Sequence, residues 1–278
     1  MKKQICLLAA VFALCANHAG ATTLVFADFS DVSTLQLNGS AAQVGNVLRL
    51  TPAVTGQSGT AFSLSPITLS GAYSFSTFFS FRISSIAGTF GDSDGSGADG
   101  ITFIVQTNSN TAGGGGGGIG YQGILNSAAV EYDTYNNGSF GNDPNGNHVG
   151  IDLGGNIQSI ATALVTPRLN DSQVWFSWID YDGTTGVMDV RLSLTNARPA
   201  SAILSSTFNL GNQLGTTSAF VGFGSGTGAG FGNHDILSWE FRDTFAPIDN
   251  GSEVPEPGTL SLLGLGSLAL AKLRRRRA

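Results

Sequence analysis

The segment from Glu131 to Asp152, EYDTYNNGSFGNDPNGNHVGID, contains an unusual number of side chains that can bind metal ions. These candidate ligands lie within eighteen residues of one another and are Glu131, Asp133, Asn137, Asp143 and His148. Glycine-rich turn sequence separates them, so the segment is poorly suited to a hydrophobic core. Carboxylates that face one another repel unless a cation lies between them. The segment therefore predicts a metal site, against the alternative of a polar hairpin whose acidic side chains are solvated.

One group of these ligands suits a transition-metal ion. Glu131 and Asp133 are two residues apart in a predicted strand, so both side chains point to the same face. His148 opens the next predicted strand and adds an imidazole, which suits first-row metals but does not suit calcium. Together with Asp143, these three side chains would bind Mn²⁺ or another first-row ion.

A second group suits calcium, which prefers carboxylate, amide and backbone carbonyl oxygens. The oxygens available for it are those of Asp133, the backbone carbonyl of Tyr135, Asn137 and Asp143. Asp133 and Asp143 belong to both groups, so their carboxylates would bridge the two ions. The segment thus predicts a calcium ion beside a manganese-type ion.

The elements that would position these ligands are β-strands. Nearly every periodic segment alternates with a period of two, is rich in Val, Ile, Phe and Thr, and is bounded by Gly, Asn, Ser or Asp. The predicted strands are Thr23–Phe29, Val47–Leu50, Phe62–Leu64, Tyr73–Ile83, Ile101–Gln106, Ala129–Tyr135, Val149–Leu153, Val174–Tyr181, Val187–Leu194, Ser206–Leu210, Phe220–Phe223 and Ile236–Arg242. We therefore predict an all-β fold, an antiparallel sandwich in one domain, with Trp175, Trp178 and Trp239 between its sheets.

The first 21 residues have the pattern of a secretory signal peptide. Lys2 and Lys3 precede an apolar run that is too short to span a bilayer, and small residues follow at Ala19–Ala21. Both cysteines, Cys6 and Cys15, lie in this leader. The mature chain would therefore contain no disulfide and would depend on its core and on bound ions.

The C-terminal sequence VPEPGTLSLLGLGSLALAKLRRRRA contains three parts in order: Pro255-Glu256-Pro257, an apolar stretch and an arginine cluster. An apolar stretch followed by basic residues is typical of a short transmembrane segment whose positive end stays in the cytoplasm. The arrangement at residues 254–278 resembles the bacterial PEP-CTERM sorting signal. This resemblance implies a transient membrane tether, processing by an exosortase-type enzyme, and export to the cell surface or exopolysaccharide matrix.

Without both terminal signals the chain is strongly acidic. Residues 22–253 contain six arginines, no lysine and 18 of the 19 acidic residues, which gives a net charge near −12. Such a surface repels phosphate backbones, so the composition argues against nucleic-acid binding. Divalent cations would relieve part of this repulsion.

The sequence AVEYDTYNN…NDPNGNHVGID resembles the metal-binding segment of the legume-type (L-type) lectins. Other stretches resemble the same family in order along the mature chain: LRLTPA…GTAFSLSPITL, FSTFFSFRI, ADGITFIV, GGGIGYQGI, VWFSWIDYDGTTGVMDVRLS and HDILSWEF. The resemblance implies a jelly-roll sandwich like that of concanavalin A at residues 22–250. It also implies carbohydrate binding, with Ca²⁺ and Mn²⁺ held by the two ligand groups described above.

The resemblance further implies a sugar site beside the metals. Asp99 would accept hydrogen bonds from sugar hydroxyls, and the peptide bond that joins Ala98 to Asp99 would be cis. Asn137 would donate to the same sugar from its amide nitrogen while its oxygen faces calcium. Gly117 would donate a backbone N–H, although the run Gly113–Gly118 leaves the register open by one or two residues.

Two features of this implied sugar site stay open. Either Tyr135 or Phe140 would stack on the sugar ring, and the sequence does not choose between them. The loop from Thr227 to Phe231 would shape specificity, but its bare glycine-rich sequence names no sugar.

An enzyme of this fold class would be a glycosidase. One group with a similar sandwich uses E-x-D-x-x-E on a strand, with the two glutamates as nucleophile and acid/base. Glu131 and Asp133 match its first two positions, but the third position holds Asn136. An amide cannot donate the proton that a leaving sugar oxygen needs, so we expect no catalytic residues.

We therefore expect an exported calcium- and manganese-dependent lectin whose partners are glycans or exopolysaccharide, and not an enzyme. The alternative is a non-catalytic matrix protein whose calcium site only stabilises the fold. Loss of glycan binding on replacement of Asp99 would distinguish the two.

Overall fold

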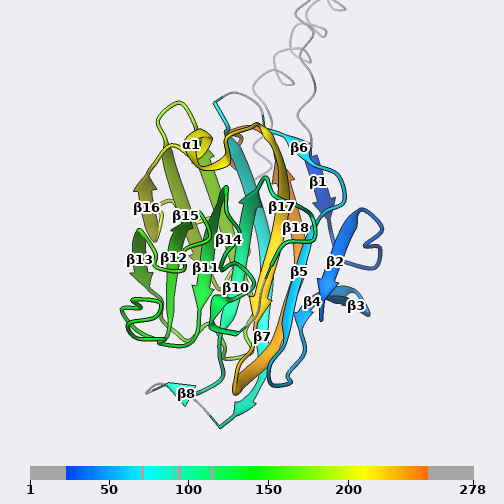
Figure 1. Cartoon of the computed structure of the whole chain (residues 1–278), viewed down its shortest axis with the longest axis vertical. Coiled ribbons are helices and arrows are strands. Elements are labelled where there is room, and N and C mark those ends of the chain that lie inside the picture. The colour runs from blue at the N-terminus through cyan, green and yellow to red at the C-terminus, as the bar shows by residue number, and fades with distance from the viewer. Residues whose placement is uncertain (1–22, 70–71, 90, 93–94, 114–115, 250–278) are drawn as a thin grey trace, which may run out of the picture.

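Two large β-sheets pack face to face in the described part of the chain (Figure 1). The computed structural model describes residues 23–69, 72–89, 91–92, 95–113 and 116–249. Helical structure in this part of the chain is limited to α1 (Leu210–Leu214) and the 3-10 helix η1 (Gly116–Gly118).

The two predicted terminal signals, at residues 1–21 and 254–278, lie outside the described residues. The short transmembrane segment expected within the second signal lies there too. In the part of the chain that the structure describes, no helix has the length and apolar character needed to cross a membrane.

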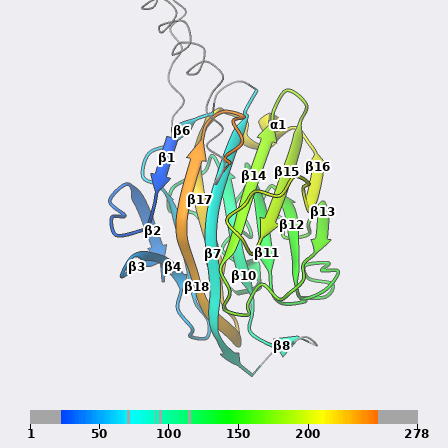
Figure 2. The ribbon, with the colours of Figure 1, turned by 180° about the vertical axis from the view of Figure 1, so that it is seen from behind.

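The first sheet, which we call the back sheet, faces the viewer in Figure 2. Its strands in spatial order are β16 (Leu204–Thr207), β15 (Val187–Ser193), β14 (Trp175–Asp182), β7 (Phe75–Gly88), β18 (Gly230–Arg242), β4 (Val47–Thr51) and β3 (Ala42–Val44), with β1 (Thr23–Phe26) also paired to β18. The opposite, front sheet contains β13 (Ala161–Leu164), β12 (His148–Leu153), β11 (Ser127–Asp133), β10 (Gly100–Gln106), β17 (Ser218–Gly226), β5 (Ser58–Ser63) and β2 (Leu35–Gly39), with β6 (Ile67–Thr68) also paired to β17. Neighbouring strands run antiparallel throughout, which confirms the predicted all-β sandwich.

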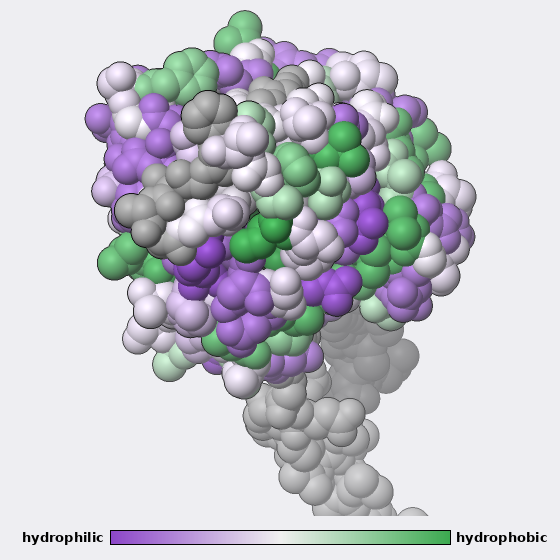
Figure 3. All heavy atoms as spheres, turned by 90° about the horizontal axis from the view of Figure 1, so that it is seen from below, coloured by the Kyte–Doolittle hydropathy of each residue, from purple (hydrophilic) through white to green (hydrophobic). Residues whose placement is uncertain are grey.

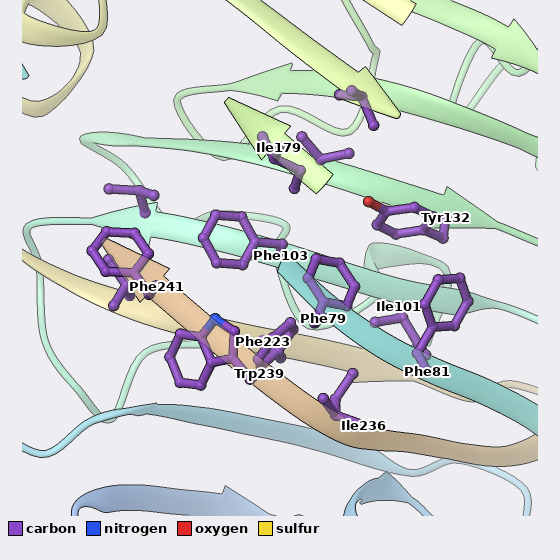
Figure 4. Close-up of a cluster of buried hydrophobic side chains, with 14 of the residues drawn as sticks. Phe79, Phe81, Ile101, Phe103, Tyr132, Ile179, Phe223, Ile236, Trp239 and Phe241 are labelled. Carbon is purple, nitrogen blue, oxygen red and sulfur yellow. The ribbon is translucent and has the colours of Figure 1, made fainter. Parts of the chain in front are cut away.

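The core lies between the sheets and is built from aromatic rings of both (Figure 4). Phe79 and Trp239 come from the back sheet, whereas Phe103, Tyr132 and Phe223 come from the front sheet. The ring centroids of Phe79 and Phe223 lie 5.0 Å apart, as do those of Phe223 and Trp239, in the edge-to-face geometry that aromatic pairs prefer. Burial of each such side chain contributes about 1.5–3 kcal/mol. This core fixes the strand ends from which the candidate site is built.

Trp178 does not lie between the sheets, so that part of the prediction is wrong. It follows Trp175 by three residues in β14, and successive residues of a strand point to opposite faces. Trp175 therefore faces the core, whereas Trp178 packs with Phe78 and Ile248 on the outer face of the back sheet. The chain after β18 thus covers part of that face.

The predicted strand Ser206–Leu210 is wrong in its second half, because Leu210 begins α1. Asn209 caps this helix: its side-chain oxygen accepts the N–H of Asn212 at 2.9 Å. Gly215 ends the helix with a φ of 71°, a left-handed conformation that favours glycine. These two caps override the local alternation of apolar and polar residues.

The strand registers bring several loops to one end of the sandwich. Gly100 begins β10 and lies between Asp133, where β11 ends, and Gly226, where β17 ends. His148 begins β12 directly beside Asp133. The loops joined to these four residues therefore meet at one end, which we call the loop end and which the small β8 (Gly91–Asp92) and β9 (Gly95–Ser96) hairpin marks in Figure 1.

Candidate functional site

The register between β11 and β12 gathers predicted metal ligands on one face of the front sheet. His148 pairs with Asp133, and Gly150 pairs with Glu131. Tyr132, between the two acidic residues, points into the core, so the acidic side chains and the imidazole point the other way. They are nevertheless buried, with at most 3% of any of them exposed. Buried charged groups of this kind require partners.

The loop from residue 134 to residue 147, which we call the acidic loop, adds Asp143 to this face. Ligand atoms of Asp133, Asp143 and His148 all lie within 4.8 Å of one another. The loop backbone turns toward the two carboxylates, because the N–H of Asn137 donates to Asp143 at 2.6 Å and the N–H of Tyr135 donates to Asp133 at 2.6 Å. The structure thus brings together residues from both ends of the predicted segment.

The imidazole of His148 is oriented by the acidic loop. Its Nδ1 lies 2.9 Å from the backbone carbonyl of Asn145, and because a carbonyl only accepts, Nδ1 carries a proton. In the neutral tautomer that this bond selects, the lone pair of Nε2 points toward Oε1 of Glu131, 3.3 Å away. Two such electron-rich atoms repel unless a proton or a cation lies with them. A backbone partner that fixes the tautomer in this way is typical of a metal-binding histidine.

The electrostatics of the acidic cluster (Glu131, Asp133, Asp143 and Asp152) also favour cations. Burial raises the pKa of Asp133 well above its usual range, and repulsion from Glu131 and then Asp143 raises it further. Divalent cations would neutralise this charge. The donor set fits two ions, with carboxylate, amide and carbonyl oxygens for calcium and carboxylates plus an imidazole for a transition metal. The residues that could hold them are those predicted from the sequence: Glu131, Asp133, Tyr135, Asn137, Asp143 and His148.

Two residues at this site were not identified from the sequence: Asp152, a member of the acidic cluster, and Ser159, which contacts it. Ser159 Oγ lies 2.6 Å from Oε1 of Glu131 and 2.7 Å from Oδ1 of Asp152, so it bridges the two carboxylates. Burial raises the pKa of Asp152 well above its usual range, and repulsion from Glu131 adds to the rise. The available signal was the alternation in β12, where His148, Gly150 and Asp152 share a face.

Asp99 lies at the loop end beside the acidic cluster. Its backbone carbonyl accepts the N–H of Thr134, the first residue of the acidic loop, at 2.9 Å. The side chain is 4% exposed, and its Oδ2 has no hydrogen-bond partner among the described residues. Burial raises the pKa of this carboxyl to about 7, and a hydrogen bond from the Gly228 N–H opposes that rise. The Ala98–Asp99 peptide is cis, as the family resemblance led us to expect.

Gly117 and Asn137, which are twenty residues apart in the chain, touch at this end. A Cβ on Gly117 would lie only 2.7 Å from Nδ2 of Asn137, so the amide packs directly on the glycine backbone. Of the two aromatic candidates for stacking on a sugar, Phe140 is 53% exposed and Tyr135 is partly buried. The surface of the loop end contains hydrophilic and hydrophobic residues side by side (Figure 3).

The predicted specificity loop is braced by an N-terminal segment. Thr227 is fully buried, and its hydroxyl accepts the N–H of Gln57 at 2.8 Å and donates to the carbonyl of Val54 at 2.7 Å. The N–H of Gly56 donates to the carbonyl of Gly228 at 3.1 Å. These bonds hold Gly228 against the Asp99 carboxylate.

Comparison with family models identifies two regions of the chain. The model of the legume lectin domain matches residues 21–256. The model of the PEP-CTERM protein-sorting motif matches residues 253–277.

Curated relatives resemble most of this chain, but only over part of their own length. The L-type lectin-domain containing receptor kinase VIII.1 of Arabidopsis thaliana is 33% identical in an alignment 264 residues long, which covers 86% of this chain and 34% of that protein. The L-type lectin-domain containing receptor kinase SIT2 of Oryza sativa subsp. japonica is 32% identical in an alignment 272 residues long, which covers 87% of this chain and 39% of that protein. The chain thus spans little more than a third of the length of these relatives.

Solved structures of plant lectins have the same fold. Lectin II from Ulex europaeus superposes with a TM-score of 0.66 at 27% identity, covering 80% of this chain and 97% of the lectin. The basic winged bean lectin, solved with the Tn-antigen, gives a TM-score of 0.66 at 27% identity, with 80% and 98% covered. The predicted jelly-roll sandwich is therefore confirmed.

Proposed function

Because the chain belongs to the legume lectin family, we propose that it is a calcium- and manganese-dependent lectin that binds glycans without hydrolysing them. The proposed sugar site consists of Asp99, Gly117 and Asn137. The proposed metal ligands are Glu131, Asp133, Tyr135, Asn137, Asp143 and His148.

The main support for this proposal is the carboxylate of Asp99. It is buried beside the acidic loop, and one of its oxygens accepts no hydrogen bond from the described residues. Oδ2 of Asp99 has no partner among the described residues, although burying an unsatisfied polar atom costs about 1–3 kcal/mol. A ligand hydroxyl would supply the missing donor. Such a cost is tolerated where a ligand completes the hydrogen bonding, so the unused acceptor supports a binding role for Asp99.

The groups at the loop end are complementary to adjacent sugar hydroxyls. Asp99 accepts hydrogen bonds, whereas the amide nitrogen of Asn137 and the backbone N–H of Gly117 donate them. Each sugar hydroxyl can act as both donor and acceptor. When bound, the ions would neutralise the acidic cluster and hold the oxygen of Asn137, which leaves its nitrogen for the sugar. The contact between Gly117 and Asn137 supports this arrangement.

We further propose three functional segments in the chain. A signal peptide at residues 1–21 would direct export, the lectin domain would comprise residues 22–250, and the sorting signal at residues 254–278 would tether the chain briefly to the membrane. The sorting-motif match supports processing by an exosortase-type enzyme and delivery to the cell surface or exopolysaccharide matrix. Mass spectrometry of the exported protein tests these limits, because retention of either terminal segment would contradict them.

A glycan array probed in Ca²⁺ and Mn²⁺, and again after chelation with EDTA, tests the proposed function. We expect binding to a defined set of glycans with the metals and none after chelation. Loss of a hydrogen bond to a charged group, in Asp99→Asn, should cost about 1.5–3 kcal/mol, or about 10- to 150-fold in affinity.

Asp31→Asn is the matched control, because Asp31 is exposed and its hydrogen bond to the Ser33 N–H can be made by Asn as well. Glycan binding that survives chelation would overturn the metal dependence. A folded, metal-loaded protein that binds no glycan would instead support the alternative, a structural matrix protein.

A further inference from the structure

Behind the proposed sugar site, four polar groups form a buried hydrogen-bonded chain. His234 Nδ1 lies 2.6 Å from Thr51 Oγ1, which lies 3.1 Å from Ser225 Oγ. Ser225 Oγ lies 2.8 Å from the backbone carbonyl of Gly100. The three side chains have no exposed surface. His234 and Thr51 lie on β18 and β4 of the back sheet, whereas Ser225 and Gly100 lie on β17 and β10 of the front sheet. The hydrogen bonds therefore cross the core at the loop end.

The chemistry of these groups fixes the direction of every hydrogen bond. A carbonyl only accepts, so Ser225 donates its single hydroxyl proton to Gly100. Ser225 must therefore accept from Thr51, and Thr51, whose own proton is now used, must accept from Nδ1–H of His234. These bonds permit one arrangement of protons, in which Nδ1 of His234 carries a proton.

The surroundings of His234 keep it neutral. Its Nε2 is buried and has no partner among the described residues, and burial lowers its pKa to about 4. The neighbouring Asp235 lies 2.7 Å from Arg49 on β4 and 3.5 Å from Arg82 on β7, which compensate its charge. At neutral pH His234 therefore acts as a fixed donor.

This series of hydrogen bonds ends at Gly100, the residue that follows Asp99. The Asp99 carbonyl is held by the N–H of Thr134, and the next carbonyl, that of Gly100, is held by Ser225. Gly100 has a φ of +146°, and a Cβ there would overlap with the carbonyl of Tyr132, so no side chain can fix this position. The Ser225 hydroxyl takes over that task. Oδ2 of the Asp99 side chain has no hydrogen-bond partner among the described residues, so the direction of this side chain depends on its backbone.

We propose that His234, Thr51 and Ser225 are positioning residues that aim the Asp99 carboxylate at the glycan. This role rests on the proposed function of Asp99. The contrasting role is purely structural. In that case these hydrogen bonds only satisfy buried polar groups, and breaking them would lower stability without changing the affinity for glycans or the position of Asp99.

Thr51→Val separates the two roles, because valine keeps the shape of threonine but leaves Nδ1–H of His234 without an acceptor. Thr77→Val is the matched control. Thr77 is equally buried, donates to the carbonyl of Glu240 at 2.8 Å and accepts from Nε1 of Trp239 at 3.0 Å. It lies near the start of β7, at the end of the sandwich opposite the loop end.

The measurements are thermal stability, affinity for the strongest glycan of the array with both metals saturating, and a crystal structure of each variant. We expect both variants to lose similar stability, but only Thr51→Val to lose affinity, by about five- to tenfold, and to shift the Asp99 carboxylate by about 0.5 Å or more. Thr51→Ser should restore both. If Thr51→Val does not fold, Ser225→Ala breaks the chain at its last hydroxyl.

An unmoved Asp99 with unchanged affinity in Thr51→Val, or an equal loss of affinity in Thr77→Val, would overturn the positioning role. Failure of the wild-type protein to bind any glycan would refute the proposed function instead. In that case, a comparison of Asp99 between the crystal structures of the wild type and the variants would still show whether these hydrogen bonds determine its position.

Discussion

Gly150 lies directly opposite Glu131 in the ladder between β11 and β12, and its missing side chain makes room for the Glu131 carboxylate. A Cβ on Gly150 would overlap with Oε1 of Glu131 and with Oγ of Ser159. Gly150 is therefore required by the space that Glu131 occupies. His148 and Asp152 lie on the same face of β12, so three alternate residues of this strand lie against Glu131.

Gly150→Ala should displace Glu131 and weaken the transition-metal site. Changes that disturb the orientation of a metal ligand typically cost about 10- to 100-fold in metal affinity, and we expect a loss of this size for Mn²⁺. Calcium should be affected less, because Glu131 belongs only to the proposed manganese group. Isothermal titration with each metal measures both effects.

Gly228→Ala is the control for that experiment. A Cβ on Gly228 would meet only Oδ2 of Asp99, at an ordinary contact distance of 3.6 Å. This variant should keep the metal affinity of the wild type. Equal Mn²⁺ affinity in Gly150→Ala and the wild type would remove Glu131 from the proposed ligands.

The buried carboxylates should make metal stabilisation depend on pH. The pKa of Asp99 is raised from 3.8 to about 7 in the folded protein, so the folded state binds more protons than the unfolded state between these values. The free energy of unfolding of the metal-free protein therefore falls as the pH rises from about 4 to about 7. The raised pKa values of Asp133 and Asp152 act in the same direction.

The quantity to measure is the Tm in Ca²⁺ and Mn²⁺ minus the Tm in EDTA, by calorimetry. We expect this difference to grow from pH 4.5 to pH 7.5 by on the order of 5 °C. The pKa of His234 is lowered to about 4, so its titration raises the free energy of unfolding as the pH rises. This effect is the same with metals and in EDTA, so it cancels in the Tm difference. A difference that is constant with pH would contradict the prediction.

The chain after β18 should contribute to the stability of the domain. Ile248 is 2% exposed and packs against Phe78 and Trp178, so Ile248→Ala should lower the free energy of unfolding by about 2–5 kcal/mol. Phe245→Ala is the control, because Phe245 is 49% exposed and its loss should change stability by about 0.5 kcal/mol or less. Urea unfolding followed by tryptophan fluorescence measures both. Equal effects would place the end of the stable domain before Ile248.

The strands and the cluster of metal ligands could be predicted from sequence because both depend on local patterns. Glu131 and Asp133 share a face by strand alternation alone, and the acidic loop returns the chain to them within fifteen residues. The same alternation indicates that Trp175 and Trp178 face opposite ways, although we predicted that both lie in the core. The helix at Leu210 was missed because its caps were not weighed against the alternation.

The remaining features depend on contacts between distant segments, which periodicity does not reveal. Ser159 reaches Glu131 across 28 residues, and Thr51 reaches His234 across 183. Such contacts follow from the order of strands in the sheets. Asp99 itself carried no local signal and was selected only through the family resemblance.

β18 sets the separation between the proposed pocket and the place where the chain leaves the domain. The strand begins two residues after Gly228, which touches Asp99, and Ile248 packs against Phe78, the partner of Glu240 near the far end of the strand. Ten residues of extended strand measure about 34 Å. A copy held at a point beyond Ile248 would therefore carry its proposed pocket at the end of the sandwich away from that point.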